Sequence, residues 1–383
     1  MQPLRVARIS HSVLPRIGGQ ELHIHRLGIH LARMGVEQRL FYLWGGPPAE
    51  HNIRCHRIPP PPWPRGSHMA DGLWLGKGVW TRLKAMASLG WRPHIVHSHG
   101  DATDALVGGV LARAIGARAV HTVHGGLPQR LSYGPWARIC FSLSERIIAV
   151  SPRLVSQLRE WGVDQAKCVV MSSGVDMEAL GRVTVEEGWA LGARWGLKPG
   201  DEIVLCVGRL SPVKGQRYLL EAGQILSALR PRLRLVFVGG GKLEKPLKAL
   251  ARGQQWAVFT GELAPAQVYK LYKIAKVSVL PSVELFSQHE GTPTALMEAM
   301  AAKVPVVATK TGGIQELIAD HQDGILVAPR DPMQLAEAIN RFLTDPSFSQ
   351  RVGTKAYKKI VKRDWKIVAQ RIADLYRELA RNL

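Results

Sequence analysis

The feature that most constrains the fold is an alternation of short apolar runs with helix-length amphipathic stretches. In the first half of the chain, strand candidates recur at 4–10, 38–43, 94–97, 117–123, 146–150 and 168–172. Helical periodicity separates most of them, as in the stretch where apolar side chains recur at Ile24, Leu27, Leu31 and Met34. Such β-α-β alternation predicts a parallel sheet covered by helices.

The same alternation begins again in the second half. Strand candidates fit 201–208, 233–238, 257–259, 277–280, 304–308 and 325–327, and helices fit 216–229, 266–274, 294–302, 314–319 and 333–343. Because 383 residues exceed a single ordinary core, we expect two α/β domains, at 1–180 and 200–360. The segment 181–199 has no clear strand, so we expect it to connect them. The last segment, 361–383, predicts an amphipathic helix with Val368, Ile372, Leu375 and Leu379 on one face.

The net charge and the cysteines indicate which partners and which cellular compartment suit the protein. The formal net charge is +21, spread over both halves, which favours anionic partners such as phosphates, nucleic acid or an anionic membrane face. The four cysteines form no CxxC pair, which is typical of a reducing compartment. The chain reaches a strand at once and has no apolar run of membrane-spanning length. We expect a cytoplasmic protein, with a peripheral position on the inner face of the cytoplasmic membrane as the alternative.

Two glutamates, Glu290 and Glu298, lie on either side of an expected helix start. The start is marked by Thr292, Pro293 and Thr294. Free N–H groups at a helix start bind phosphate, and Gly291 lets the backbone approach a ligand closely. The arrangement suits a nucleotide diphosphate sugar, with sugar hydroxyls at Glu290 and ribose hydroxyls at Glu298. The alternative is a surface helix with two solvated glutamates.

A second group of residues lies in the sequence VGRLSPVKG at 207–215. Arg209 and Lys214 fall in an expected strand-to-helix turn. Two cations at the carboxyl end of a strand match a ligand in the crevice of an α/β sheet, where they would neutralise a diphosphate leaving group. The alternative is a basic surface turn.

Two weaker signals lie in the first half. Gly18, Gly19, Gln20 and Glu21 form a further phosphate-binding candidate, for which a purely structural loop is the alternative. Histidines cluster near strand ends at His94, His97, His99, His121 and His124. No carboxylate or cysteine stands at a familiar ligand spacing, so we expect no metal site. His124, beside a Gly-Gly turn, is the best candidate for a substrate contact.

Together these motifs resemble the retaining GT-B glycosyltransferases of family 4, also called glycosyl transferases group 1. The matching elements are E-x7-E at Glu290 and Glu298, G-R-L-x-x-x-K-G at 208–215, G-G-x-E at 18–21 and the strand-end His124. The resemblance implies a GT-B fold, with two Rossmann-like domains whose parallel sheets face each other across a cleft. It further implies that 1–180 binds the acceptor, that 200–360 binds the donor, and that the helix at 361–383 crosses back to the first domain.

The resemblance also implies residue roles. Arg209 and Lys214 would bind the donor diphosphate, Glu290 the sugar and Glu298 the ribose, while His124 would contact the sugar near the reacting centre. The implied reaction is a retaining transfer of a hexose-type sugar from a UDP- or GDP-sugar to a glycan or lipid-linked acceptor, without metal or cofactor. The implied setting is the assembly of bacterial cell-surface polysaccharide or lipopolysaccharide.

The sequence departs from the family pattern at a few positions. Many members read E-G-F-G where this chain has Thr292 and Pro293, and Glu284 is a second, worse-spaced glutamate ahead of the helix. Ser173 precedes Gly174 where the family usually has asparagine. The base, the sugar and the acceptor are therefore left open.

Three other functions remain as alternatives. A sugar-nucleotide epimerase or phosphorylase on the same fold would share the donor residues. A basic nucleic-acid-binding protein would account for the charge, although no recognised nucleic-acid motif is present, and we expect no nucleic-acid partner. A non-catalytic scaffold is disfavoured because all the donor-site motifs are present.

The segment 59–92 alternates tryptophans with cations. It contains Trp63, Trp74, Trp80 and Trp91 together with Arg65, Lys77, Arg82, Lys84 and Arg92. Tryptophan favours the lipid headgroup region and cations favour anionic lipid, so one hypothesis is that this segment docks on a membrane. The alternative is a helix whose tryptophans pack inward.

Overall fold

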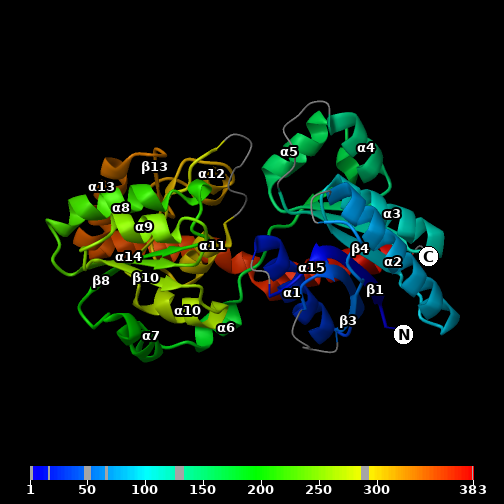
Figure 1. Ribbon diagram of the computed structural model, residues 1–383, viewed down its shortest axis with the longest axis horizontal. Coiled ribbons are helices and arrows are strands. Elements are labelled where there is room, and N and C mark those ends of the chain that lie inside the picture. The colour runs from blue at the N-terminus through cyan, green and yellow to red at the C-terminus, as the bar shows by residue number, and fades with distance from the viewer. Residues whose placement is uncertain are drawn as a thin grey trace. The chain divides into compact units, whose positions relative to one another are not determined.

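The computed structural model describes residues 3–15, 18–46, 53–64, 68–125, 133–285, 293–381 and 383. Contacts divide the chain into two compact units, each with its own parallel sheet (Figure 1). Unit 1 comprises Met1–Gly174 and Trp365–Leu383, and unit 2 comprises Val175–Asp364. The prediction of an α/β protein with two parallel-sheet domains is confirmed.

The sheet of unit 1 contains β1 (Arg5–Ser12), β2 (Glu37–Trp44), β3 (Arg54–Arg57), β4 (Ile95–Gly100), β5 (Arg118–Val123), β6 (Arg146–Ala149) and β7 (Cys168–Val170). Their order in the sheet is β3-β2-β1-β4-β5-β6-β7, and every pair is parallel. After β3 the chain crosses to the other side of β1, which makes the carboxyl ends of β1 and β4 a topological switch point. Ligands of open α/β sheets bind at such points.

Helices cover both faces of this sheet. They are α1 (Gly19–Arg33), α2 (His68–Ser88), α3 (Ala102–Ile115), α4 (Gly134–Ser142), α5 (Pro152–Glu160) and α15 (Trp365–Ala380). Along β1, Val6 packs with α1 and α15, whereas Ala7 and Ile9 pack with α2 and α3. The period of two in a strand therefore divides the core into two layers.

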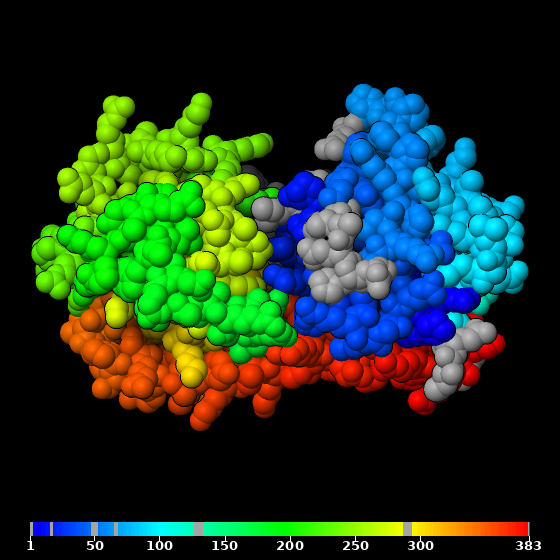
Figure 2. Space-filling view, turned by 90° about the horizontal axis from the view of Figure 1, so that it is seen from below, coloured from blue at the N-terminus to red at the C-terminus, as the bar shows by residue number. Residues whose placement is uncertain are grey.

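The C-terminal helix α15 packs within unit 1. Its apolar stripe is buried as the periodicity predicts, through Val368, Ile372, Leu375 and Leu379. α15 lies against α1, and its outer side reaches the molecular surface (red in Figure 2). The two chain segments that leave and re-enter unit 1 run side by side, because Val175 donates to the carbonyl of Arg363 at 2.8 Å.

The sheet of unit 2 contains β8 (Glu202–Val207), β9 (Leu233–Val238), β10 (Ala257–Gly261), β11 (Val277–Leu280), β12 (Val306–Thr309) and β13 (Ile325–Val327). Their order is β10-β9-β8-β11-β12-β13, with all pairs parallel. Here the switch point lies between β8 and β11. The expected G-R-L-x-x-x-K-G turn follows β8, and the described start of the loop before α11 follows β11. The turn and this loop therefore begin at one edge of the sheet.

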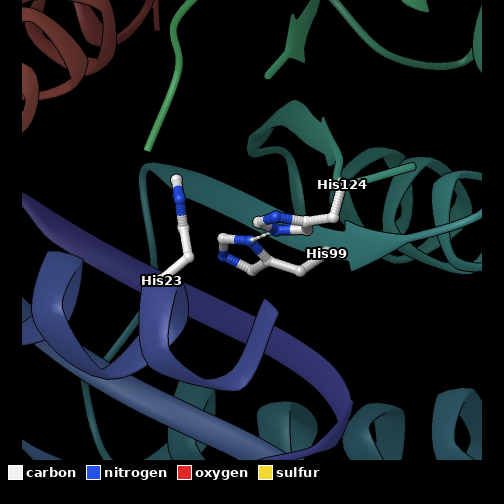
Figure 3. A group of neighbouring side chains, drawn as sticks. All are labelled: His23, His99 and His124. Atoms are coloured by element: carbon white, nitrogen blue, oxygen red, sulfur yellow. Dashed lines mark hydrogen bonds between the residues drawn. The ribbon is translucent and has the colours of Figure 1, made fainter. Parts of the chain in front are cut away.

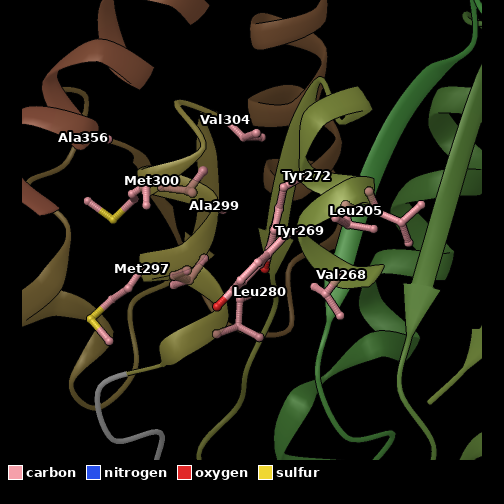
Figure 4. Close-up of a cluster of buried hydrophobic side chains, with 14 of the residues drawn as sticks. Leu205, Val268, Tyr269, Tyr272, Leu280, Met297, Ala299, Met300, Val304 and Ala356 are labelled. Carbon is pink, nitrogen blue, oxygen red and sulfur yellow. The ribbon is translucent and has the colours of Figure 1, made fainter. Parts of the chain in front are cut away.

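The helices of unit 2 are α6 (Met177–Arg182), α7 (Val185–Gly192), α8 (Gln216–Ser227), α9 (Glu244–Leu250), α10 (Pro265–Ile274), α11 (Thr294–Ala301), α12 (Ile314–Leu317), α13 (Pro332–Thr344) and α14 (Pro346–Ile360). One face of the sheet packs against α10 and α11 (Figure 4). Met297 and Met300, both fully buried, fix α11 there. The other face packs against α8 and α13.

The expected connection at 181–199 lies inside unit 2, and the boundary falls earlier, after Gly174. The segment is structured because Thr184 and Glu187 form a capping box that starts α7. α7 then packs on α10, where Glu187 pairs with Lys270 at 3.0 Å. The segment 361–364 also belongs to unit 2, and the return to unit 1 begins at Trp365.

Three of the four tryptophans of the segment 59–92 pack inward, whereas Trp63 is 38% exposed. Trp91 is 6% exposed and donates to Glu37, Trp74 donates to the carbonyl of Pro59, and both contact the core under α2. Trp63 donates to Asp71 at 3.0 Å. The structure therefore favours inward packing over tryptophan insertion into lipid. No helix in the described part of the chain is long and apolar enough to cross a membrane.

Candidate active site

The turn after β8 places Arg209 and Lys214 at the carboxyl edge of the unit 2 sheet. Arg209 is exposed and Lys214 half-buried, and both follow a strand whose four central residues are buried. Lys214 is the last residue of a short 3-10 turn, Pro212–Lys214, which lies between Arg209 and α8. Gln216, buried at the start of α8, donates to the carbonyl of Arg209 at 2.9 Å. The side chains of the two cations therefore project from a turn whose backbone is tied to the following helix.

Two glycines fix this turn against its neighbours. Gly215 has φ of +63°, and a Cβ there would lie 2.0 Å from the carbonyl oxygen of Pro281. Gly239, at the end of β9, has φ of +132°, and a Cβ there would lie 2.2 Å from the carbonyl oxygen of Gly208. A side chain at either position would be both strained and obstructed. The turn is thus clamped between the ends of β9 and β11.

The loop after β11 adjoins the same turn. Val283 donates to the carbonyl of Val213 at 2.8 Å, which joins the backbone after β11 to the turn after β8. This loop leads toward α11, whose N-cap residue Pro293 provides no side-chain hydrogen bond to the helix start. A helix start leaves its first N–H groups without intrahelical acceptors and carries the positive end of the dipole. The cations and the loop that leads to the helix start therefore share one edge of unit 2.

Glu298 lies on α11 beyond this start. Its side chain is half-buried, and its charge acts on Tyr272, whose pKa is raised well above its usual range first by burial and then by Glu298. Tyr272 donates to the carbonyl of Ala295 at 2.8 Å and so anchors the first turn of α11. Thr294, in that turn, is half-buried. Glu298 is therefore held on a well-packed helix.

Three predicted donor-site residues, Glu290, Gly291 and Thr292, lie outside the described residues. Glu284, the worse-spaced glutamate, has a different task. Its carboxylate accepts from the backbone N–H of Gly312 at 3.1 Å, and its carbonyl accepts from Arg330. Glu284 thus ties the loop after β11 to the turn after β12.

In unit 1, the glycine pair lies at the start of α1, and Gly19 is the first residue of the helix. Gly18 is the N-cap of α1 and takes an extended conformation. A Cβ on Gly18 would lie 2.4 Å from Oε2 of Glu21, whereas one on Gly19 would meet nothing within 4 Å. Glu21 accepts from Ser12 Oγ at 2.6 Å, so this glutamate joins the helix start to the end of β1.

His124 lies at the end of β5 and meets two other histidines. His99 on β4 and His23 on α1 approach it, so that three rings gather at the carboxyl edge of the unit 1 sheet (Figure 3). Nδ1 of His99 lies 3.2 Å from Nε2 of His124, and His23 stands edge-on to His124 with the ring centroids 4.6 Å apart. Helix α1 carries both the glycine pair and His23.

Burial keeps these histidines neutral. It lowers the pKa of His23 to about 3, with smaller contributions from His97 and Arg8. It also holds the pKa values of His99 and His124 well below the usual range, helped by neighbouring histidines and Arg8. Arg8 is itself fully buried, and burial lowers its pKa to about 10. Neutral rings can each donate or accept a hydrogen bond to a hydroxyl group.

A second histidine group lies on the other face of the unit 1 sheet. Nδ1 of His11 lies 2.8 Å from Asp104 Oδ1, at an angle outside hydrogen-bond geometry, and Nδ1 of His68 lies 3.1 Å from Asp101 Oδ2. Asp101 and Asp104 also form the capping box of α3. These side chains are therefore occupied in holding the start of α3.

Three features of the site were not predicted from the sequence, namely His23, Gly239 and the Ser12–Glu21 contact. His23 lies on the core-facing stripe of α1, four residues before Leu27, where an apolar side chain is expected. A polar residue in that position is a sequence signal for a buried polar site. No comparable signal marks Gly239, because its tight approach to Gly208 exists only in the folded sheet.

Known proteins resemble this chain over both units. A family model described as glycosyltransferase family 4 matches residues 17–179, and one described as glycosyl transferases group 1 matches residues 189–359. A GDP-mannose-dependent alpha-mannosyltransferase of Mycolicibacterium smegmatis is 28% identical over 97% of this chain and 97% of its own.

Solved structures share the fold. HepE of Anabaena, in complex with UDP-glucose, has a TM-score of 0.77 at 20% identity and covers 98% of this chain and 100% of its own. WaaG, a glycosyltransferase involved in lipopolysaccharide biosynthesis, has a TM-score of 0.74 at 16% identity. The match covers 97% of this chain and 99% of the WaaG chain. The two family models together span both units, and the fold agrees. The chain therefore belongs to the GT-B glycosyltransferases of family 4.

Proposed function

We propose that this glycosyltransferase moves a hexose-type sugar from a nucleotide diphosphate sugar, such as a UDP- or GDP-sugar, to a glycan or lipid-linked acceptor. The observation that carries the proposal is the clamped turn with Arg209 and Lys214, tied to the loop that leads to α11. Two cations beside a helix start suit a diphosphate. The names of the mannosyltransferase relative and of the UDP-glucose complex support this donor class.

Each predicted residue receives a role. Arg209 and Lys214 bind the diphosphate, Glu298 accepts hydrogen bonds from the ribose, and Glu290 accepts them from the sugar. The backbone around the start of α11 supports the phosphates, through Gly291, Thr292, Pro293 and Thr294. In unit 1, Gly18 and Gly19 leave room for the donor phosphates, and His124 contacts the transferred sugar.

We propose that the reaction retains the configuration of the anomeric carbon. The bond from this carbon to the phosphate oxygen breaks, and the acceptor oxygen bonds to the same face. The acceptor proton passes to the leaving phosphate oxygen. Arg209 and Lys214 stabilise the growing negative charge on the leaving group, which a metal ion does in other enzymes, so we propose transfer without a metal.

We further propose that the acceptor is an intermediate in the assembly of bacterial surface polysaccharide or lipopolysaccharide. A peripheral position on the inner face of the cytoplasmic membrane fits α2, whose outer stripe exposes Met69 and Leu73 at 54% and 55%. Lys77 and Lys84 continue this stripe and are exposed. Apolar side chains beside cations favour an anionic lipid surface.

The test is a transfer assay with UDP-, GDP- and ADP-sugars and glycan or lipid-linked acceptors. We expect acceptor-dependent release of nucleoside diphosphate, with a product of the same anomeric configuration as the donor by NMR. Conversion of the donor without an acceptor would instead identify an epimerase on this fold. A product of inverted configuration would contradict the retaining mechanism.

A further inference from the structure

Three histidines from separate elements place their ring nitrogens around one point of unit 1. One nitrogen each from His23, His99 and His124 lies within 4.8 Å of the others (Figure 3). His23 and His99 are 1% and 0% exposed, whereas His124 is half-buried. The chain reaches this point from α1, β4 and the end of β5, so no motif spacing along the sequence could reveal the group.

The spacing of the closest pair matches that of metal ligands. Nδ1 of His99 and Nε2 of His124 lie 3.2 Å apart in a hydrogen bond, so an ion bound by both nitrogens would replace the proton that they share. Two nitrogens that each bind a tetrahedral Zn²⁺ at the usual bond length are separated by about 3.3 Å. The sheet backbone therefore already holds this pair at the distance that a shared ion requires.

The third ring is oriented by its other nitrogen. Nδ1 of His23 lies 3.0 Å from Ser173 Oγ, and the ring packs edge-on against Trp365. Its Nε2 is buried and has no hydrogen-bond partner among the described residues. Metal-bound histidines are commonly held in this way, with one nitrogen on a protein oxygen and the other on the ion. A buried nitrogen without a partner is costly, and a ligand at this point would remove that cost.

The charge around the group limits what it can bind. The group consists of three histidines and has no carboxylate among its members. The positive charge of the buried Arg8 lowers the pKa of each ring. A bound dication would therefore favour water or an anion as its fourth ligand. Imidazole sets of this kind suit Zn²⁺, Cu²⁺ and Ni²⁺ better than Mg²⁺ or Ca²⁺, which prefer oxygen ligands.

We propose that His23, His99 and His124 form a binding site for a transition-metal dication of the Zn²⁺ type, with an open fourth position. Metal binding by these three histidines does not depend on the proposed transfer reaction. One consequence rests on the proposed function, which assigns His124 to the donor sugar. Because the ion would occupy a nitrogen of His124, it should compete with the donor and inhibit transfer.

The first experiment measures metal binding by the chelator-treated, tag-free chain, with a chromophoric chelator as competitor for Zn²⁺. We expect one Zn²⁺ per chain, and a loss of affinity of more than about 10-fold in each of His99→Asn and His124→Asn. His121→Asn is the matched control, because His121 is equally buried but bonds Ser98 outside the group. Cys55→Ser should also retain binding, which excludes the exposed thiol as a ligand.

Thermal unfolding checks that each variant is folded. If His99→Asn does not fold, because His99 is more deeply buried, the affinity of His124→Asn decides the test. Absence of stoichiometric Zn²⁺ binding in the wild type, or equal affinity in His124→Asn, would overturn the proposal. Co²⁺ absorption provides a second readout, in which intense visible bands support four-coordinate nitrogen ligation. If Zn²⁺ binds at these histidines but does not compete with the donor, the metal site stands and the role of His124 in transfer fails.

Discussion

At the scale of single residues, the proposed function depends on a few side chains that the backbone presents at one sheet edge. The turn after β8 is held by Gly215 and Gly239, neither of which can carry a side chain without strain. Such preorganised cations stabilise a leaving group without rearranging during the reaction. Substitutions at this turn therefore test the assignment most simply.

Arg209→Ala and Lys214→Ala should each slow transfer by about 100-fold, or about 3 kcal/mol of transition-state stabilisation. The physical reason is the loss of one positive charge beside the departing diphosphate. The measurement is steady-state turnover with a saturating donor. Arg217→Ala is the matched control, because Arg217 is exposed on the next helix and pairs with Glu221. Wild-type turnover in both folded turn variants would refute the site.

The two glutamates should divide their work. Glu298→Gln should weaken binding of the free nucleoside diphosphate by about 10-fold, because a neutral amide accepts ribose hydroxyl protons less strongly. Glu290→Gln should leave that affinity nearly unchanged and slow transfer instead. Calorimetry with the nucleotide and turnover with the sugar donor separate the two effects. An equal loss of nucleotide affinity in both variants would contradict the division.

Much of this site follows from the sequence, and part of it does not. The placement of Arg209, Lys214 and Glu298 is local, because each depends on one strand and the helix after it. Gly239 depends on contacts between segments far apart in the chain, so sequence periodicity does not reveal it. Periodicity does mark His23 as a polar residue on the buried stripe of α1, but its ring partners come from other segments. The roles of Glu290, Gly291 and Thr292 stay predictions, since these residues lie outside the described part of the chain.

At the scale of elements, apolar periodicity predicts the buried strands well and the polar ones poorly. β9, β11 and β13 agree with the predicted ranges, because apolar residues dominate each run and only Arg234 and Ser278 interrupt them. β3 was missed because its residues, Arg54–Arg57, are polar and largely exposed at the sheet edge. α7 was missed because its start depends on the capping box of Thr184 and Glu187 rather than on an apolar stripe.

The start of α3 provides a pH-dependent test. The hydrogen bond with Asp101 raises the pKa of His68 to about 9, while partial burial opposes the shift. A raised pKa stabilises the fold fully below the unfolded pKa of about 6.5, and this contribution is lost as pH rises through about 9. His68→Ala should therefore cost about 1 kcal/mol or less near pH 6, since the side chain is half-exposed, and nothing near pH 11.

Urea unfolding of the wild type and of His68→Ala at these two pH values measures the difference. His321→Ala is a suitable control, because His321 is equally exposed and lies in unit 2. A cost of the His68 substitution that is independent of pH would show that the pair with Asp101 does not supply the stability.

At the scale of the whole molecule, the chain builds two sheets and returns to the first with its last helix. A net charge of +21 adds a long-range preference for anionic ligands and surfaces to the local sites. The outer stripe of α2 combines this charge with exposed Met69 and Leu73. These observations lead to a prediction about membranes that does not involve the inward-packed tryptophans.

The protein should float with liposomes that contain anionic lipid, and binding should fall as salt rises. Lys77→Glu with Lys84→Glu should remove most of the binding, because each cation contributes about 1 kcal/mol near an anionic surface. Lys248→Glu with Lys273→Glu, in unit 2, is the control for net charge. Equal flotation of the two double variants would show that α2 is not the contact surface.

The most direct test of the donor site is calorimetry of the wild type and Lys214→Ala against UDP, GDP and ADP. We predict that one of these nucleotides binds the wild type, with a Kd of about 1 μM to 1 mM as is usual for enzyme substrates. Lys214→Ala should lose about 10-fold or more in affinity, because it lacks a cation at the diphosphate. If no nucleoside diphosphate binds the wild type, or if the variant binds as tightly, the turn after β8 is not a donor site.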